Sequence, residues 1–333
     1  MLLRSIPFLF VLLWASGFVG ARLGLQYAEP ATLLAIRMLA NIALFLLLIV
    51  LLRRRVPTGA AFWHSCVVGL GIHGFYLGGT YWAISLGMPA GLSSLLVGIQ
   101  PILTALILVV TVQERFRFSQ WLGLALGLLG ISLVLSGKMD WQTEAHKTLA
   151  ITLCLMALVG ITLGTLYQKR FCHGVDMVGL AITLCLMALV GITLGTLYQK
   201  RFCHGVDMVG GAMVQYLAAA CLFLPFAWQF ETMQVQWTTT FILTLVWLVV
   251  VLSCAAILLL LYMVKNGAAS SVASVFYLVP PVTALQAWLM FGESFDTKAM
   301  VGFLLAAVAV YLVVRKPRKV KSESVKPQSY LTE

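Results

Sequence analysis

The feature that most constrains the fold is a near-continuous succession of apolar runs, each about as long as a transmembrane helix. The runs lie near residues 5–26, 31–52, 60–86, 89–112, 119–137, 148–168, 180–199, 210–228, 238–264, 268–291 and 298–314. A bilayer core about 30 Å thick requires roughly 20 apolar residues per helix. Only 10% of the 333 residues are charged, against about 25% in soluble domains. The sequence therefore predicts an all-α polytopic membrane protein.

The formal net charge of +11 does not indicate a nucleic-acid partner. The Lys and Arg residues lie in short clusters between apolar runs and in the C-terminal tail, a pattern typical of membrane orientation signals. The seven Cys residues show no CxxC spacing, so we expect neither disulfides nor a metal site. We expect no cofactor. We expect the lipid bilayer to surround the chain. Arg4 and the apolar run after it resemble a signal peptide, but the spans that follow at once favour an uncleaved first span.

A perfect tandem repeat occupies 149–179 and again 180–210, identical at all 31 positions. Packing cannot demand such identity, because the two copies would meet different neighbours. We interpret the repeat as a recent in-frame duplication or a sequence artefact rather than a functional repeat.

A second, weaker repeat relates the two halves of the chain. A shift of 179 residues lays Pro101, Glu114 and Gly123 onto Pro280, Glu293 and Gly302. Without the tandem copy the shift is 179 − 31 = 148 residues, which suits five spans in each half. Two five-helix halves related by inversion are a recurring plan of membrane transporters.

Positive residues near the span ends predict the orientation. If one tandem copy spans the membrane, fifteen lie on the side of the N-terminus and three on the other. Both termini are then cytoplasmic. If both copies span, the counts become nine and eleven, and the bias is lost. We therefore predict a ten-helix bundle that uses one copy, with the other displaced beside it or along the interface; the sequence leaves open which copy this is.

Several short motifs occur in a characteristic order. The chain opens with Leu13 to Phe18, Glu29-Pro30 and Leu34 to Arg37. These motifs are followed by Gln100-Pro101, Glu114-Arg115 and Gln120 to Gly123. The corresponding part of the second half contains Tyr277 to Pro281 and Gly292-Glu293. In this order and spacing the chain resembles EamA-type members of the drug/metabolite transporter superfamily.

The resemblance implies two inverted five-helix repeats, a central cavity and alternating access. The first EamA repeat would occupy 1–137 and the second 148–316, including the duplicated extra helix, before a basic disordered cytoplasmic tail at 317–333. We expect a multi-pass protein of the bacterial inner membrane that exports small metabolites: amino acids or related neutral, zwitterionic or anionic compounds. The alternatives are a non-transporting scaffold or receptor, and a flippase of lipid-linked substrates.

Polar and aromatic side chains at mid-membrane depth are candidates for the substrate cavity, because an unsatisfied polar group in hydrocarbon is costly. The fourth span and its counterpart contain prolines that break the backbone hydrogen-bond ladder, and the first and third spans contribute aromatic rings. The candidates are Trp14, Tyr76, Tyr81, Ser94, Gln100, Pro101, Ser274, Tyr277 and Pro280. The alternatives are ordinary kinked helices with Ser bonded to its own turn, and interfacial aromatic anchors.

Two ionisable side chains within spans are candidates for a charge or proton site. Arg37 lies about two turns into the second span, where a charge costs about 2.5 to 3.5 kcal/mol at the helix centre. It could bind an anion or carboxylate, or have a structural role by snorkelling or by pairing with Glu29. His73 lies near the middle of the third span, where proton transfer and a neutral His bonded to a neighbouring carbonyl are the two interpretations.

The eleven Asp and Glu residues all lie in loops, at span ends or in the tail. This disfavours exchange of lipophilic cations for protons, which requires a membrane-buried acid. The spans also lack the clustered His, Asp or Glu of a membrane-embedded enzyme. A face of small residues at Gly123, Gly127 and Gly130, with Gly302 and Ala306, predicts either a homodimer contact or packing within the bundle.

Overall fold

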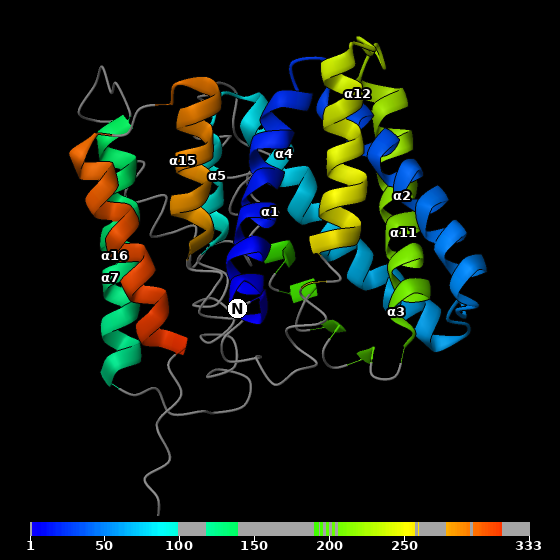
Figure 1. Cartoon of the computed structure of the whole chain (residues 1–333), viewed down its shortest axis with the longest axis horizontal. Helices are drawn as coiled ribbons and strands as arrows, with labels where there is room; N and C mark the ends of the chain where they lie inside the picture. The colour runs from blue at the N-terminus through cyan, green and yellow to red at the C-terminus, as the bar shows by residue number, and fades with distance from the viewer. Residues whose placement is uncertain are drawn as a thin grey trace, which may run out of the picture.

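In the computed structural model the described part of the chain is helical (Figure 1). It comprises residues 2–98, 118–138, 190–192, 194–195, 198–199, 202–203, 206–256, 259, 278–293 and 296–314. The helices are α1 (Leu2–Gly24), α2 (Pro30–Leu52), α3 (Ala60–Gly69), η1 (Leu70–Tyr76), α4 (Leu77–Ser85), α5 (Ala90–Val97), α7 (Phe118–Lys138), α11 (Met208–Phe230), α12 (Thr239–Val246), η2 (Trp247–Ala256), α15 (Val279–Phe291) and α16 (Thr297–Val314). The segments η1 and η2 are π-helical and continue α3–α4 and α12 without a break.

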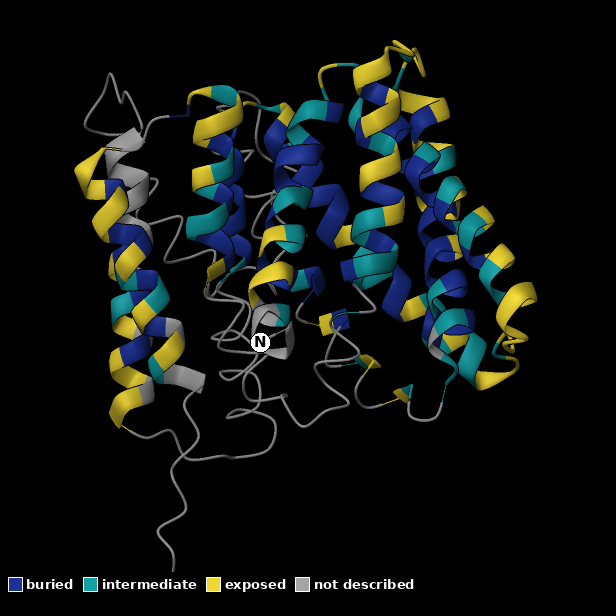
Figure 2. Cartoon of the chain, viewed as in Figure 1, coloured by how far each residue is buried: buried dark blue, intermediate teal, exposed yellow. Residues whose placement is uncertain are grey.

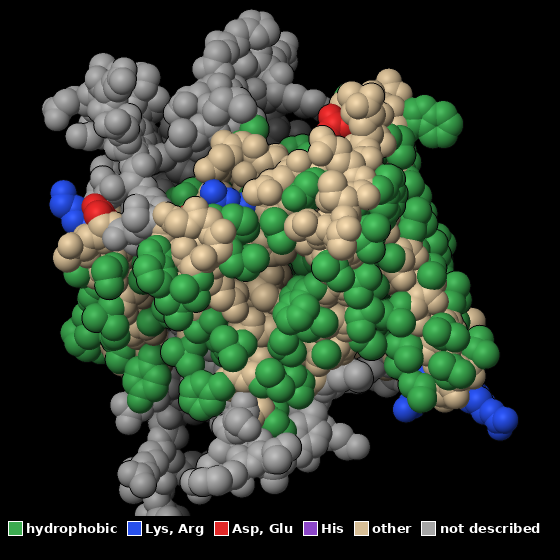
Figure 3. Space-filling model, turned by 45° about the horizontal axis from the view of Figure 1, so that its top comes forward, with side chains coloured by type: hydrophobic (Ala, Val, Ile, Leu, Met, Phe, Trp, Pro, Cys, Tyr) green, Lys and Arg blue, Asp and Glu red, His purple; other side chains and the backbone are tan. Residues whose placement is uncertain are grey.

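The described helices have the length and surface of membrane spans. Four of them, Pro30–Leu52, Ala60–Ser85, Val209–Phe230 and Thr239–Ala256, are long and apolar enough to cross a bilayer. Their inner faces are buried and their outer faces exposed (Figure 2). Hydrophobic side chains cover much of the flank seen in Figure 3. Large hydrophobic residues of the described chain are exposed, among them Trp228 at 83% and Trp63 at 69%. A soluble monomer rarely exposes such a surface, which confirms the predicted fold class.

Helices that correspond in the two halves pack against each other in pairs: α2 with α11, α5 with α15, and α7 with α16. Two of these pairs are antiparallel. Glu231, directly after the C-terminal end of α11, hydrogen-bonds to the N-terminal end of α2, and Glu293, after the end of α15, does the same for α5. This arrangement of corresponding helices is the one that inverted halves require.

The contact between α2 and α11 ends in a reciprocal pair of carboxylate caps. Both Glu231 oxygens accept hydrogen bonds of 2.7 Å, one from the Ala31 N–H and the other from the Thr32 N–H and hydroxyl. Glu29 in turn accepts from the Thr232 N–H and hydroxyl at 2.7 and 2.8 Å. The two acids thus satisfy the free N–H groups at this end of α2 and in the loop after α11.

A buried ion pair lies at the same end of the bundle as these caps. Glu293 is 8% exposed, pairs with Arg22 at the end of α1, and accepts a hydrogen bond from the Ala90 N–H at 3.2 Å. The Arg22 guanidinium also lies 4.4 Å from the centre of the Phe291 ring. The pair therefore joins α1, α5 and α15.

The π-helical segments pack across the two halves in matching ways. The segment η1 contacts α11, and η2 contacts α2. On α1, a Cβ built at Gly17 would lie 2.7 Å from Leu252 of η2. In the second tandem copy, a Cβ built at Gly191 would lie 2.8 Å from the Gly71 carbonyl of η1. Part of the second copy thus packs on η1 as α1 packs on η2.

The small-residue face of α7 is occupied within the chain. A Cβ built at Gly130 would lie 2.6 Å from the Gly302 carbonyl and 2.9 Å from the Ala306 nitrogen of α16. This is the intramolecular packing that the sequence left open beside a homodimer contact. Dimerisation and the repeat boundaries 1–137 and 148–316 stay predictions, and the first tandem copy (149–179) and the tail (317–333) lie outside the described residues.

Candidate functional site

Side chains from both halves of the bundle enclose a cavity of about 80 Å³. It is lined by Trp14, Gly17 and Phe18 of α1, Arg37 of α2, Ile72, His73 and Tyr76 of η1, Leu77, Thr80 and Tyr81 of α4, Ile192, Tyr216 of α11, and Leu252 and Ser253 of η2. Apolar walls with a few convergent polar groups are typical of small-molecule sites. Five residues predicted from the sequence, Trp14, Arg37, His73, Tyr76 and Tyr81, meet at this one cavity.

Arg37 is the charged group of the lining, and it is buried at 4% exposure. Its Nη1 donates a hydrogen bond of 2.8 Å to the phenol oxygen of Tyr81. Its Nε is buried and has no hydrogen-bond partner in the described structure. The structure corrects both structural interpretations of this residue: Arg37 does not snorkel outward, and Glu29 bonds to Thr232 instead of pairing with it.

Two further polar side chains near Arg37 also lack partners among the described residues. The Thr80 hydroxyl lines the cavity at 2% exposure and makes no hydrogen bond. Asn41 follows Arg37 by one helical turn on α2, is fully buried, and has neither amide atom bonded. Buried polar groups are normally hydrogen-bonded, so this cluster requires an explanation.

His73 belongs to a different polar group on the same cavity. Its ring lies 4.5 Å from that of Tyr216 on α11. Ser253 of η2 lines the same cavity, and its hydroxyl donates to the Leu248 carbonyl at 3.2 Å. The two interpretations of His73, a proton carrier and a neutral His bonded to a neighbouring carbonyl, both stay predictions.

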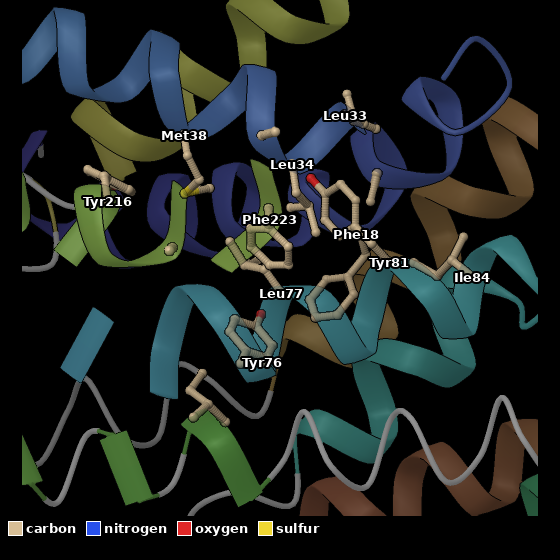
Figure 4. Packing of buried hydrophobic residues seen from close by; sticks show 14 of the residues in the cluster. Phe18, Leu33, Leu34, Met38, Tyr76, Leu77, Tyr81, Ile84, Tyr216 and Phe223 are labelled. Carbon is tan, nitrogen blue, oxygen red and sulfur yellow. The ribbon is translucent and has the colours of Figure 1, made fainter. Parts of the chain in front are cut away.

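The predicted aromatic residues form part of the packed interior. Tyr76 and Tyr81 are 7% and 1% exposed, so they are not interfacial anchors. Figure 4 shows both in one cluster with Phe18, Leu34 and Met38. Trp14 packs against Phe10, with ring centres 5.4 Å apart. These rings give the cavity flat apolar walls.

Ser94 and Pro280, the described candidates of the fourth span and its counterpart, are not among the residues that line the cavity. The Ser94 hydroxyl donates to the Gly91 carbonyl at 2.8 Å, which is the alternative of a Ser bonded to its own turn. Pro280 packs where α15 meets α5, and a Cβ built at Gly98 would lie 2.9 Å from its Cγ. Gln100, Pro101, Ser274 and Tyr277 lie outside the described residues.

The sequence did not single out Tyr216, Ser253 or Ile192 as members of the site. Tyr216 is the largest of these omissions, because it is 1% exposed and contacts His73. Tyr216 could have been found from the sequence, because it is an aromatic residue within a span and lies beside Gln215. Tyr76 was selected because it is an aromatic residue within a span. In η2, Ser253 is a polar residue in the apolar run Trp247–Ala256, and it was not selected.

Antiparallel packing of corresponding helices, an interior cavity lined from both halves and an apolar outer surface are together typical of a polytopic membrane transporter. Comparison with known proteins agrees, since the profile of the EamA-like transporter family matches residues 5–136 and 179–315. The chain belongs to the EamA-like transporter family. This places it among transporters rather than enzymes. The second match begins at the end of the first tandem copy and so includes the second.

Individual relatives carry transporter names. The chain is 32% identical to the uncharacterized transporter YdfC of Bacillus subtilis over 164 residues, which is 48% of this chain and 51% of that protein. It is 23% identical to the uncharacterized transporter YvbV of the same organism over 321 residues, covering 95% and 92%. A probable amino-acid metabolite efflux pump of Salmonella typhimurium is 26% identical over 162 residues, covering 49% and 52%. The matches to YdfC and the efflux pump thus span about half the length of those relatives.

The fold itself has a counterpart among solved structures. One crystal structure superposes with a TM-score of 0.57, covering 92% of this chain and 94% of the other. The sequence identity is 18%, so the likeness concerns the fold alone.

Proposed function

We propose that the protein exports small metabolites, amino acids or related neutral, zwitterionic or anionic compounds, by alternating access. The observation that carries the proposal is the cavity between the two halves, which contains one buried cation and is otherwise mostly apolar. No Asp or Glu belongs to the described lining. A lipophilic cation would therefore find no negative charge there. A carboxylate could pair with the buried cation, and a neutral compound needs no counter-charge.

The cavity volume supports a mechanism in which the helices move. About 80 Å³ is much less than the roughly 300 Å³ or more of typical ligand pockets. Substrate entry would require the halves to separate at one end. The carboxylate caps between α2 and α11 and the Arg22–Glu293 pair hold one end together, so this end would open in the other state. With both termini cytoplasmic, it faces away from the cytoplasm.

The direction of transport in this proposal comes from the relatives. Two of them are named as probable amino-acid metabolite efflux pumps. In a bacterial inner membrane, efflux would carry the substrate from the cytoplasm outward.

A transport assay with purified protein tests the proposal. Proteoliposomes loaded with unlabelled L-leucine are placed in radiolabelled L-leucine, and the counterflow of label is compared with empty liposomes and with the cation tetraphenylphosphonium as substrate. We expect counterflow of L-leucine and none of the cation. If amino acids, amino-acid derivatives and anionic metabolites all give the signal of empty liposomes, the chain is a scaffold or receptor; if lipid-linked compounds alone cross, it is a flippase.

A further inference from the structure

We propose that Arg37 and Thr80 form the subsite that binds the carboxylate group of the substrate. This proposal deepens the proposed function and rests on it, because the ligand is a substrate only if the protein transports it. Binding at the subsite can be measured without transport. The ligand class is a small carboxylate with an apolar side chain.

The first argument is that the charge of Arg37 has no counter-ion among the described residues. The side chain is 4% exposed, and its described hydrogen bond goes to the neutral phenol of Tyr81. The described ion pairs of the chain are Arg22–Glu293 and Arg54–Asp207. The acids closest to Arg37 along the chain and at the α2–α11 contact, Glu29 and Glu231, are bonded to threonines and backbone N–H groups. A buried cation without an acid partner calls for an anion.

The second argument is the type of polar atom left without a partner. Nε of Arg37 is a donor and nothing else, and the Thr80 hydroxyl can donate. Both are buried, both residues line the cavity, and neither atom has a described partner. A carboxylate offers acceptor positions on two oxygens and forms strong charge-assisted bonds with a guanidinium. The unpartnered donors therefore match a carboxylate.

The third argument concerns the rest of the ligand. Trp14, Phe18, Leu77, Ile192 and Leu252 surround the polar groups with apolar surface. Such walls suit an aliphatic or aromatic side chain and leave the many hydroxyls of a sugar unpaired. No acid of the described lining would face an ammonium group. The site should thus recognise the carboxylate more strictly than the amine.

Binding to purified protein in detergent tests the subsite. The probes are L-leucine, N-acetyl-L-leucine, which keeps the carboxylate without the ammonium, and L-leucinamide, which keeps the ammonium without the carboxylate. The apparent affinity follows from the rise in melting temperature during titration with each probe. We expect both carboxylates to bind and L-leucinamide to bind at least about tenfold more weakly.

The variants separate recognition from folding. Arg37→Gln should weaken both carboxylates about tenfold to a hundredfold, and Arg37→Lys should weaken them less, because it keeps the charge but loses the planar fork. Arg55→Gln, at an exposed residue beyond the end of α2, is the matched control and should bind as the wild type does. If Arg37→Gln gives no cooperative melt, Thr80→Val, which removes one donor and keeps the charge, should still weaken the carboxylates.

Three results would overturn the subsite: equal affinity for L-leucinamide and L-leucine, unchanged carboxylate binding in a folded Arg37→Gln variant, or no binding of either carboxylate. Selective carboxylate binding without flux in proteoliposomes would refute the proposed function and leave the subsite standing. Equal flux of L-leucine and L-leucinamide would refute the subsite and leave the transporter standing.

Discussion

Arg37 of α2 donates a hydrogen bond from Nη1 to the Tyr81 hydroxyl of α4 over 2.8 Å, with both side chains almost completely buried. This bond holds a guanidinium against the wall of the cavity, and its Nε has no partner in the described part of the chain. In the proposed subsite Tyr81 would therefore act as a positioning residue and leave the charge available for a ligand.

Replacing Tyr81 by Phe tests this positioning role. Tyr81→Phe keeps the buried ring and removes the acceptor of the Arg37 bond, so the guanidinium should become less well oriented. We expect the KM of carboxylate substrates to rise about threefold to tenfold, with little change in melting temperature. Tyr27→Phe, outside the described lining, is the control. A KM equal to that of the wild type would show that Tyr81 contributes only its ring.

The buried amide of Asn41 leads to a prediction about thermal stability. Its amide is fully buried with no described partner, and such a group costs about 1 to 3 kcal/mol. Asn41→Leu, which has a similar size, should therefore raise the melting temperature. A lower melting temperature in Asn41→Leu would mean that the amide is satisfied in the folded protein.

Loss of Arg22 from the Arg22–Glu293 pair should lower the stability of the protein more than loss of Glu293. The Glu293 side chain is 5% exposed and that of Arg22 is 33% exposed. Arg22→Gln leaves a buried carboxylate without its cation, at a cost of about 3 to 5 kcal/mol. Glu293→Gln leaves an arginine that water can reach, so it should cost clearly less.

Thermal melts of the two single variants and the double variant measure this difference. The double variant should be more stable than Arg22→Gln, because it removes the unpaired acid. Equal losses in the two single variants would contradict the difference in burial.

The tandem repeat predicts the effect of a deletion. Removal of residues 149–179 leaves one copy, and the identity of the copies makes the product the same as removal of 180–210. Since part of the second copy packs on η1 through Gly191, the shortened chain should keep the bundle, the carboxylate affinity and a cytoplasmic C-terminus. A reporter fused after Glu333 gives the orientation of both chains. An extracytoplasmic reporter in the full-length chain would mean that both copies span.

The sequence predicted the class of protein and part of the site. Apolar runs and the offset of 179 residues indicated a helical membrane protein with related halves. Trp14, Arg37, His73, Tyr76 and Tyr81 were chosen because polar or aromatic groups in a span need a reason to be there, and the structure brings these five together.

Other parts of the site could not be predicted because helix rotation leaves no signal in spans that are apolar all round. The sequence could not show that Ser94 turns to its own helix while Thr80 faces the cavity. The choice of Glu29 as a partner for Arg37 depended on nearness along the chain. The acid instead bonds to Thr232, which is distant in sequence and adjacent only because the two halves pack together.

The most direct test of the account is the flux of L-leucine and L-leucinamide through proteoliposomes containing the wild type, Arg37→Gln or Arg55→Gln. The account predicts counterflow of L-leucine by the wild type and Arg55→Gln, a loss of about tenfold or more at low substrate concentration in Arg37→Gln, and little flux of L-leucinamide in all three. Flux of L-leucine by Arg37→Gln at the wild-type rate, or equal flux of both compounds, would contradict it.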